Sequence, residues 1–212
     1  MRLGTWRRRD FIAAALVGAA GGAFAAGTPV IMVVGDSLSA EYGLKRGTGW
    51  VPLLEQRLAR EKIPARVVNA SISGDTTSGG RSRLPALLQQ HKPTHVVIEL
   101  GGNDALRGLP LAQTGENLSQ MADLARKAGA RVLLVGMQVP PNYGSAYARQ
   151  FSDLFAQVAR RHQAGLVPFL LEGIADAPDP LKLFQADRIH PSEEAQPRML
   201  DNVWPELKKQ LK

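Results

Sequence analysis

The stretch Val33-Val34-Gly35-Asp36-Ser37-Leu38-Ser39 decides the fold of this 212-residue chain. It continues an apolar run that begins at Pro29, and it leads into small, turn-forming residues. The pattern predicts a short buried strand with the Ser37 hydroxyl at its carboxyl end, where open α/β sheets hold their active sites. Taken alone, the Gly-Asp-Ser triplet is better explained by a strand that ends in an Asx-type turn.

Three further segments favour a functional interpretation, because they add a glycine, an asparagine and a histidine in chain order after the serine. The segments are Asn69-Ala70-Ser71-Ile72-Ser73-Gly74-Asp75-Thr76, Glu99-Leu100-Gly101-Gly102-Asn103-Asp104 and Asp187-Arg188-Ile189-His190-Pro191. With Ser37, they resemble the SGNH, or GDSL, hydrolase superfamily, and within it the bacterial periplasmic thioesterase I/lysophospholipase/arylesterase group. The resemblance runs from Val30 to Lys212 and includes stretches outside the site, such as Arg83-Leu84-Pro85-Ala86-Leu87-Leu88.

Apolar runs alternate with amphipathic segments along the chain, which is the pattern of βαβ units that feed a parallel sheet. We expect an α/β fold, a three-layer α/β/α sandwich with a mostly parallel five-stranded sheet, as in the SGNH hydrolases and flavodoxin-like proteins. The expected strands are Val30–Val34, Arg66–Asn69, His95–Leu100, Arg131–Met137 and Leu166–Phe169. The expected helices are Trp50–Glu61, Gly80–His91, Glu116–Ala128 (ending at Gly129), Tyr147–His162 and Glu193–Leu211.

Hydrolysis through a serine requires a nucleophile, a base and a group that holds the base in one tautomer. Ser37 is the expected nucleophile and His190 the expected base. Asp187 lies three residues before His190, a spacing that lets one turn of chain bring its carboxylate to Nδ1–H and leaves Nε2 facing Ser37. A helix-capping role is the alternative for Asp187. The other three histidines have structural explanations at helix ends and turns: His91, His95 and His162.

The reaction also needs donors for the oxyanion that forms on the acyl group. We expect the side-chain amide of Asn103 and the backbone N–H groups of Gly74 and Ser37 to provide them. The alternative is that these segments are ordinary turns. Asp36 would point away from Ser37 on an extended strand, so we expect it to hold loops by hydrogen bonds rather than to join the triad.

The family resemblance implies a serine esterase or thioesterase that accepts aryl esters, acyl thioesters and lysophospholipids. It also implies that a loop after the fourth strand lines the acyl groove, with Val139, Pro140, Pro141, Asn142 and Tyr143. Glu41 stands where the best-known members carry glycine, near the expected entrance, and so bears on substrate preference. Two alternatives are a carbohydrate O-deacetylase of the same superfamily and a non-catalytic protein that binds acyl ligands.

Residues 1–25 read as an export signal, followed by a single hydrolase domain at 26–212. Arg8 and Arg9 precede an apolar stretch of small residues and the cleavage-type sequence Ala23-Phe24-Ala25, a pattern that resembles a twin-arginine signal. The apolar stretch is shorter than the roughly 20 residues needed to span a bilayer, so we expect no stable membrane anchor. The expected location is periplasmic or secreted.

The composition argues against several other classes of function. The net charge of +7 falls to +4 without residues 1–25, which hold four arginines and one aspartate. The remaining lysines near the end read as a solvated helix face, so we expect no nucleic-acid partner. The chain has no cysteine and only four histidines. His91 and His95 are four residues apart, but they flank Pro93 at an expected helix-to-strand turn and so do not share one helix face, which favours an enzyme without metal or cofactor. We expect a monomer whose partner is a small acyl ester or thioester.

Overall fold

The computed structural model describes residues 27–212, so the expected export signal lies outside the described residues. Five strands form one sheet: β1 (Val30–Gly35), β2 (Arg66–Asn69), β3 (His95–Glu99), β4 (Arg131–Val135) and β5 (Gly165–Val167). All four pairings are parallel and the strand order is β2-β1-β3-β4-β5. This confirms the expected flavodoxin-like α/β architecture, in which the direction of winding reverses between β1 and β3.

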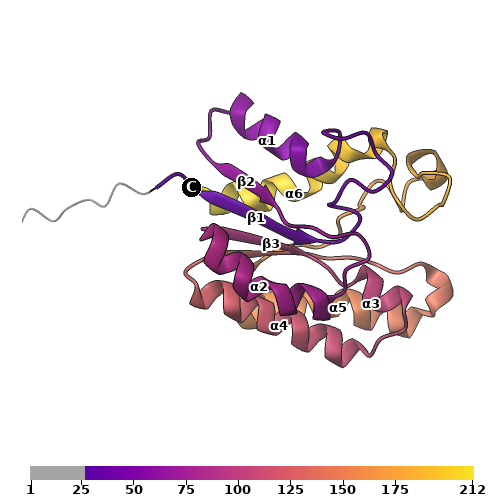
Figure 1. Ribbon diagram of the computed structural model, residues 1–212. Helices are drawn as coiled ribbons and strands as arrows, with labels where there is room; N and C mark the ends of the chain where they lie inside the picture. The colour runs from indigo at the N-terminus through magenta and orange to yellow at the C-terminus, as the bar shows by residue number, and fades with distance from the viewer. Residues whose placement is uncertain (1–26) are drawn as a thin grey trace, which may run out of the picture.

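Helices cover both faces of the sheet, which makes three layers (Figure 1). Helices α1 (Trp50–Arg60) and α6 (Gln196–Gln210) pack together on one face. On the other face lie α2 (Thr77–His91), α4 (Leu111–Lys127) and α5 (Ser145–His162), with α4 between its two neighbours. Because both faces are covered, all five residues of β3 are buried, and in β1 and β4 every residue after the first is buried.

The helix boundaries depart from the sequence prediction where capping extends a helix. Helix α2 begins at Thr77 rather than Gly80, because the Thr76 hydroxyl accepts the Gly79 N–H at 3.3 Å. Helix α4 begins at Leu111 rather than Glu116, directly after Pro110. It ends, as predicted, before Gly129, whose φ of 85° lies in the left-handed region.

The structure adds short helices that the sequence pattern did not predict. Helix α3 (Gly102–Leu106) follows β3, and η1 (Pro141–Tyr143) and η2 (Pro180–Leu183) lie in loops. The predicted helix Glu193–Leu211 is a 3₁₀ turn, η3 (Glu193–Ala195), followed by α6. The segments after β1, β2, β3 and β4 all leave the same edge of the sheet, since parallel strands point the same way (Figure 1). The expected site residues lie at that edge.

Candidate active site

Ser37, His190 and Asp187 are joined by two short hydrogen bonds. Ser37 follows the end of β1 and is half-buried. Its Oγ lies 2.9 Å from His190 Nε2, and His190 Nδ1 lies 2.6 Å from Asp187 Oδ2. The carboxylate contacts one imidazole nitrogen and the serine contacts the other, as the three-residue spacing of Asp187 and His190 predicts.

Asp187 also shapes the turn that presents the imidazole. Its Oδ1 accepts the backbone N–H groups of Ile189 at 2.9 Å and His190 at 3.0 Å. Those two amides, followed by the bond to the His190 ring, lower the pKa of Asp187 to about 2. The carboxylate thus stays ionised in neutral solution and favours the Nδ1–H tautomer of His190. It caps a turn and not a helix, since α6 begins only at Gln196.

Two residues that sequence reasoning missed hold the histidine loop against the serine loop. The Gln185 side chain donates from Nε2 to the carbonyl of Tyr42 at 2.9 Å, and its backbone N–H donates to the carbonyl of His190 at 2.8 Å. The Tyr42 ring lies 4.4 Å from the His190 ring, centre to centre, at a tilt of 37°. No sequence motif indicates the two contacts of Tyr42, because its partners lie more than 140 residues away in the chain.

Asn103 lies in α3, immediately beyond the end of β3. Gly101 has a φ of 123°, which turns the chain sharply off the strand. A side chain at Gly101 would also meet the Phe155 ring, with Cβ at 3.1 Å from Cζ. The turn brings the Asn103 amide to the serine strand, where Nδ2 donates to Asp36 Oδ2 at 2.9 Å.

Gly74 adopts a φ of 78°, a left-handed conformation that explains the glycine. Its carbonyl accepts a hydrogen bond from Arg107 Nη2 at 2.8 Å. Within residues 27–212, neither the Gly74 N–H nor the Ser37 N–H donates to another protein group. Both amides are therefore available as donors to an external oxygen at the sheet edge.

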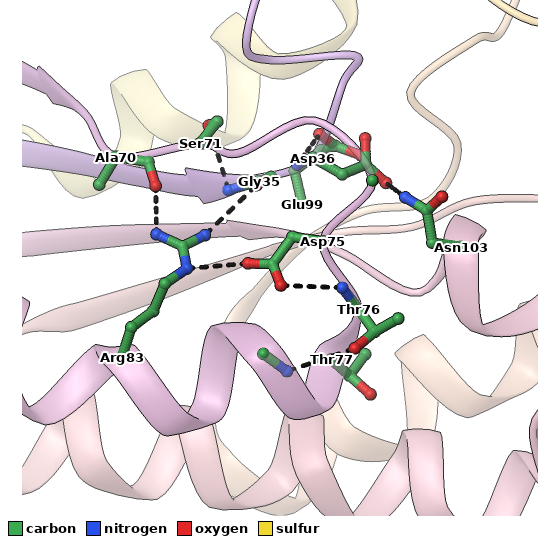
Figure 2. Close-up of polar contacts among 12 residues, drawn as sticks. Gly35, Asp36, Ala70, Ser71, Asp75, Thr76, Thr77, Arg83, Glu99 and Asn103 are labelled. Carbon is green, nitrogen blue, oxygen red and sulfur yellow. Dashed lines mark hydrogen bonds and ion pairs between the residues drawn. The ribbon is translucent and has the colours of Figure 1, made fainter.

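Arg83 of α2 ties the glycine loop to the end of the serine strand. Its guanidinium donates to the carbonyl of Ala70, to the carbonyl of Gly35 at 3.4 Å and to Asp75 Oδ2 at 2.8 Å. Figure 2 shows this arginine reaching up from the helix to all three groups. Arg83 lies in a stretch that carries the family resemblance, but its contacts with two strand ends were not predicted from the sequence.

The expected acyl-groove loop leaves the same sheet edge after β4. Val139 packs against the core, and the loop continues into η1. Tyr143 begins a row of aromatic rings through Tyr147 and Phe151, with centroids 6.0 and 6.4 Å apart. Phe151 contacts Phe155, and Phe155 lies against the Gly101 turn that precedes Asn103. The loop and the Asn103 turn therefore pack against the same row of aromatic rings. Asn142 is exposed.

Glu41 adopts a left-handed φ of 60°, a conformation that glycine adopts more easily. Its Oε1 accepts the N–H groups of Gly47 and Gly49, both at 2.8 Å, and so closes the loop after the serine. Two of the other three histidines make contacts outside the site. His95 Nε2 contacts the carbonyl of Gln210 at 3.0 Å, and His162 Nε2 contacts Ser119 Oγ at 2.5 Å.

Within the described part of the chain, no group of three histidine, aspartate or glutamate side chains is arranged to hold a metal ion. Over the same residues, no helix combines the length and the apolar character needed to cross a membrane. A half-buried serine, an imidazole and an ionised carboxylate in line, at the carboxyl edge of a parallel sheet, define the class of the protein as a serine hydrolase.

The chain belongs to the GDSL-like lipase/acylhydrolase family, whose pattern matches residues 33–197. It is 55% identical over 183 residues to the esterase TesA of Pseudomonas aeruginosa, covering 86% of this chain and 90% of that protein. It is 41% identical over 177 residues to the thioesterase 1/protease 1/lysophospholipase L1 of Escherichia coli K12, covering 84% and 82%. The psychrotrophic esterase EstA of Pseudoalteromonas matches with a TM-score of 0.80 at 41% identity, over 86% of this chain and 98% of that one. The protein is an enzyme that hydrolyses acyl esters.

Proposed function

We propose that the protein hydrolyses acyl esters through a covalent acyl-enzyme on Ser37. His190 Nε2 takes the Ser37 proton as Oγ attacks the acyl carbon, and then gives that proton to the departing alcohol or thiol. Water next attacks the acyl carbon while His190 takes its proton; the bond between the acyl carbon and Ser37 Oγ then breaks, His190 returns the proton to Oγ, and the carboxylic acid leaves. Asp187 keeps its negative charge throughout and stabilises the imidazolium. The observation that carries the proposal is the line from Ser37 Oγ to His190 Nε2 to Asp187, at 2.9 and 2.6 Å.

The oxyanion of each tetrahedral intermediate would accept hydrogen bonds from the Ser37 and Gly74 N–H groups and from the Asn103 amide. Two of these donors have no partner among the described residues, and the third is held at the same sheet edge by Asp36. Donors fixed in advance stabilise developing charge without reorganisation, which is why this contribution to catalysis is large.

The relatives suggest aryl esters, acyl thioesters and lysophospholipids as substrates, with the loop from Val139 to Tyr143 beside the acyl chain. Export would keep the enzyme from cytosolic thioesters, so simple esters and lysophospholipids are the favoured substrates. The carbohydrate deacetylase alternative has no support beyond the fold, because the acetyl-xylooligosaccharide esterase that matches this structure is only 21% identical.

Covalent labelling with a fluorophosphonate probe tests the proposed nucleophile. The wild-type enzyme should be labelled, Ser37→Ala should not, and the label should map to Ser37 by peptide mass spectrometry. Ser39→Ala is the matched control and should keep its label. Labelling that survives Ser37→Ala would place the nucleophile elsewhere.

In a separate experiment, hydrolysis rates on p-nitrophenyl esters from acetate upward would define the acyl length that the enzyme prefers.

We also propose that residues 1–25 export the protein by the twin-arginine route. The exported form should begin at Ala26, as N-terminal sequencing would show. Replacing Arg8 and Arg9 with lysine should hold the precursor in the cytoplasm, because that route recognises the arginine pair and not positive charge alone. Normal export of the double-lysine variant would leave a general secretory signal as the better explanation.

A further inference from the structure

Two buried carboxyl groups lie beneath the serine turn, and the proposed mechanism uses neither. Asp36 follows β1 and is 3% exposed, while Glu99 ends β3 and is 2% exposed. Their strands are neighbours, with Gly35 directly opposite Glu99 in the register. Figure 2 shows both carboxyl groups at this edge, with Asn103 extending toward Asp36 from the next helix. Neither group takes part in any ion pair among residues 27–212.

Each oxygen of Asp36 accepts an N–H group from the side of the site that would bind the oxyanion. Oδ1 accepts the backbone N–H of Leu38 at 3.0 Å, and Oδ2 accepts Nδ2–H of Asn103 at 2.9 Å. The first bond closes the turn that carries Ser37 and its N–H. The second bond fixes the Asn103 amide. Asp36 therefore restrains two of the three proposed oxyanion donors at once.

Glu99 makes a different set of contacts, deeper in the protein. Its Oε2 accepts the Ser39 hydroxyl at 2.7 Å and lies 3.4 Å from the Asp36 N–H. Ser39 Oγ in turn accepts the indole N–H of Trp50 at 3.2 Å. A Cβ on Gly35 would lie 2.8 Å from Glu99 Oε2 and 2.8 Å from Ser39 Oγ, so glycine is required beside this carboxyl.

Burial and mutual repulsion decide where the charge of the pair resides. Complete burial, and then the nearby Asp36 charge, raise the pKa of Glu99 well above its usual range. Burial also raises the pKa of Asp36, to about 6. The Leu38 and Asn103 N–H groups and the charge of His190 oppose this increase, and the charge of Asp75 adds slightly to it. Burial therefore favours the neutral form of Glu99. The negative charge of the pair is favoured on Asp36, because each of its two oxygens accepts an N–H group.

We propose that Asp36 and Glu99 act as one carboxyl pair with a single negative charge, and that Asp36 is the positioning residue that orients Asn103 toward the oxyanion. An ionised carboxylate can only accept hydrogen bonds, so it selects the Nδ2 end of the Asn103 amide and excludes the flipped orientation. The second N–H of Nδ2 then remains free for the substrate. Neutral Glu99 preserves this arrangement, because a second negative charge beside Asp36 would repel the carboxylate that holds Asn103. The proposal rests on the oxyanion role of Asn103.

The test is a double-mutant cycle between Asp36→Asn and Asn103→Ala, measured on a p-nitrophenyl ester at pH 8. An asparagine at position 36 has one oxygen that accepts an N–H group and one NH₂ group that can only donate. When its oxygen accepts the Leu38 N–H, its NH₂ group faces Asn103, and this permits the Asn103 amide to flip. We expect Asp36→Asn to lower kcat by about 10- to 100-fold, with KM within about twofold. Asp36→Asn keeps a side-chain oxygen that can accept the Leu38 N–H, so the turn that carries Ser37 is retained. The double mutant should therefore be no slower than Asn103→Ala alone, because the remaining effect of position 36 acts through Asn103. Asp123→Asn is the matched control on α4, where Asp123 pairs only with Lys127 at 2.6 Å, and it should keep wild-type kcat.

A normal kcat for Asp36→Asn would overturn the proposal, and so would losses that multiply in the double mutant. A structural role alone would instead lower the melting temperature and change KM together with kcat.

A spectroscopic measurement keeps the proposal testable even where a variant folds poorly. In ¹⁵N-labelled wild-type protein, the Asn103 side-chain N–H signals should shift on titration with a midpoint near the Asp36 pKa of about 6. The shift should be absent from Asp36→Asn. Asn103 signals that do not respond to pH in the wild type would contradict the proposal, whatever the kinetics. This readout needs no activity, so it separates a failure of the Asp36 proposal from a failure of the oxyanion role of Asn103.

Discussion

Asp187 and Asp36 both lie within a few residues of the reacting groups, yet the protein moves their pKa values in opposite directions. Asp187 has a 37% exposed side chain, and donors from its own turn hold its pKa at about 2. Asp36 is buried beside a second carboxyl, and its pKa is raised to about 6. The proposed site therefore has two halves. The half proposed for proton transfer is a local turn in a loop, whereas the half proposed to bind the oxyanion is built into the ends of buried strands.

The largest expected effect tests whether the proton-transfer half acts as one unit. Ser37→Ala and His190→Ala should each lower kcat by about 10⁴- to 10⁶-fold, and the double mutant should be little worse than either. The reason is that a nucleophile without its base, or a base without its nucleophile, performs no step of the reaction. The measurement is kcat for the three variants, with circular dichroism as the folding control. Losses that multiply would show that the two residues act independently.

A smaller loss is expected from the oxyanion half. Asn103→Ala should lower kcat by about 10²- to 10³-fold, roughly 3–4 kcal/mol of transition-state stabilisation, with KM almost unchanged. The amide should bind the oxyanion more strongly than it binds the ground-state carbonyl. Steady-state kinetics and a thermal melt check this together. A folded Asn103→Ala enzyme with near-normal kcat would remove this residue from the site.

The smallest effect concerns stability and sharpens the contrast between the two aspartates. Because the folded-state pKa of Asp36 lies above its unfolded value, its contribution makes folding less favourable as pH rises from about 4 to about 6. A change of about two pKa units corresponds to about 3 kcal/mol. Asp187 has the opposite sign, since its lowered pKa adds stability above about pH 4 that is lost as pH falls toward 2.

Urea unfolding of wild type and Asp36→Asn, at several pH values between 4 and 8, measures the Asp36 contribution directly. The free energy of unfolding of Asp36→Asn minus that of the wild type should increase as pH rises. This difference should become constant above about pH 7. Parallel pH profiles for the two proteins would show that Asp36 titrates normally. The pKa values of Asp36 and Asp187 would then not be shifted in opposite directions.

The sequence predicted the strands and the Asp187–His190 contact, because these are encoded locally, and it predicted the grouping of the other expected site residues through the family resemblance of four separate segments. The strand cores were correct since apolar runs mark buried parallel strands, and the Asp187–His190 contact follows from a spacing of three residues. Even the Asx-type turn that the Gly-Asp-Ser triplet suggests is present, in the bond from Leu38 N–H to Asp36. It coexists with the site and is part of it.

Contacts between distant residues could not be predicted in the same way. Glu99 sits inside an apolar run, where nothing marks a buried carboxyl that bonds to Ser39, 60 residues away. Gln185 reaches Tyr42 across 143 residues. Helix α3, with five residues, is too short for its periodicity to be recognised. The contact between Glu99 and Ser39 depends on the strand order, which places β1 beside β3. Local sequence patterns do not indicate which strands are neighbours.

The absence of a side chain at Gly35 has a consequence for how this chain can change over evolutionary time. The backbone of β1 passes so close to Glu99 and Ser39 that positions 35, 39 and 99 share one small volume. A larger residue at 35 is acceptable only after the carboxyl opposite it has been shortened, and that change alone would leave the Ser39 hydroxyl without its acceptor. The three positions are therefore expected to vary together or not at all.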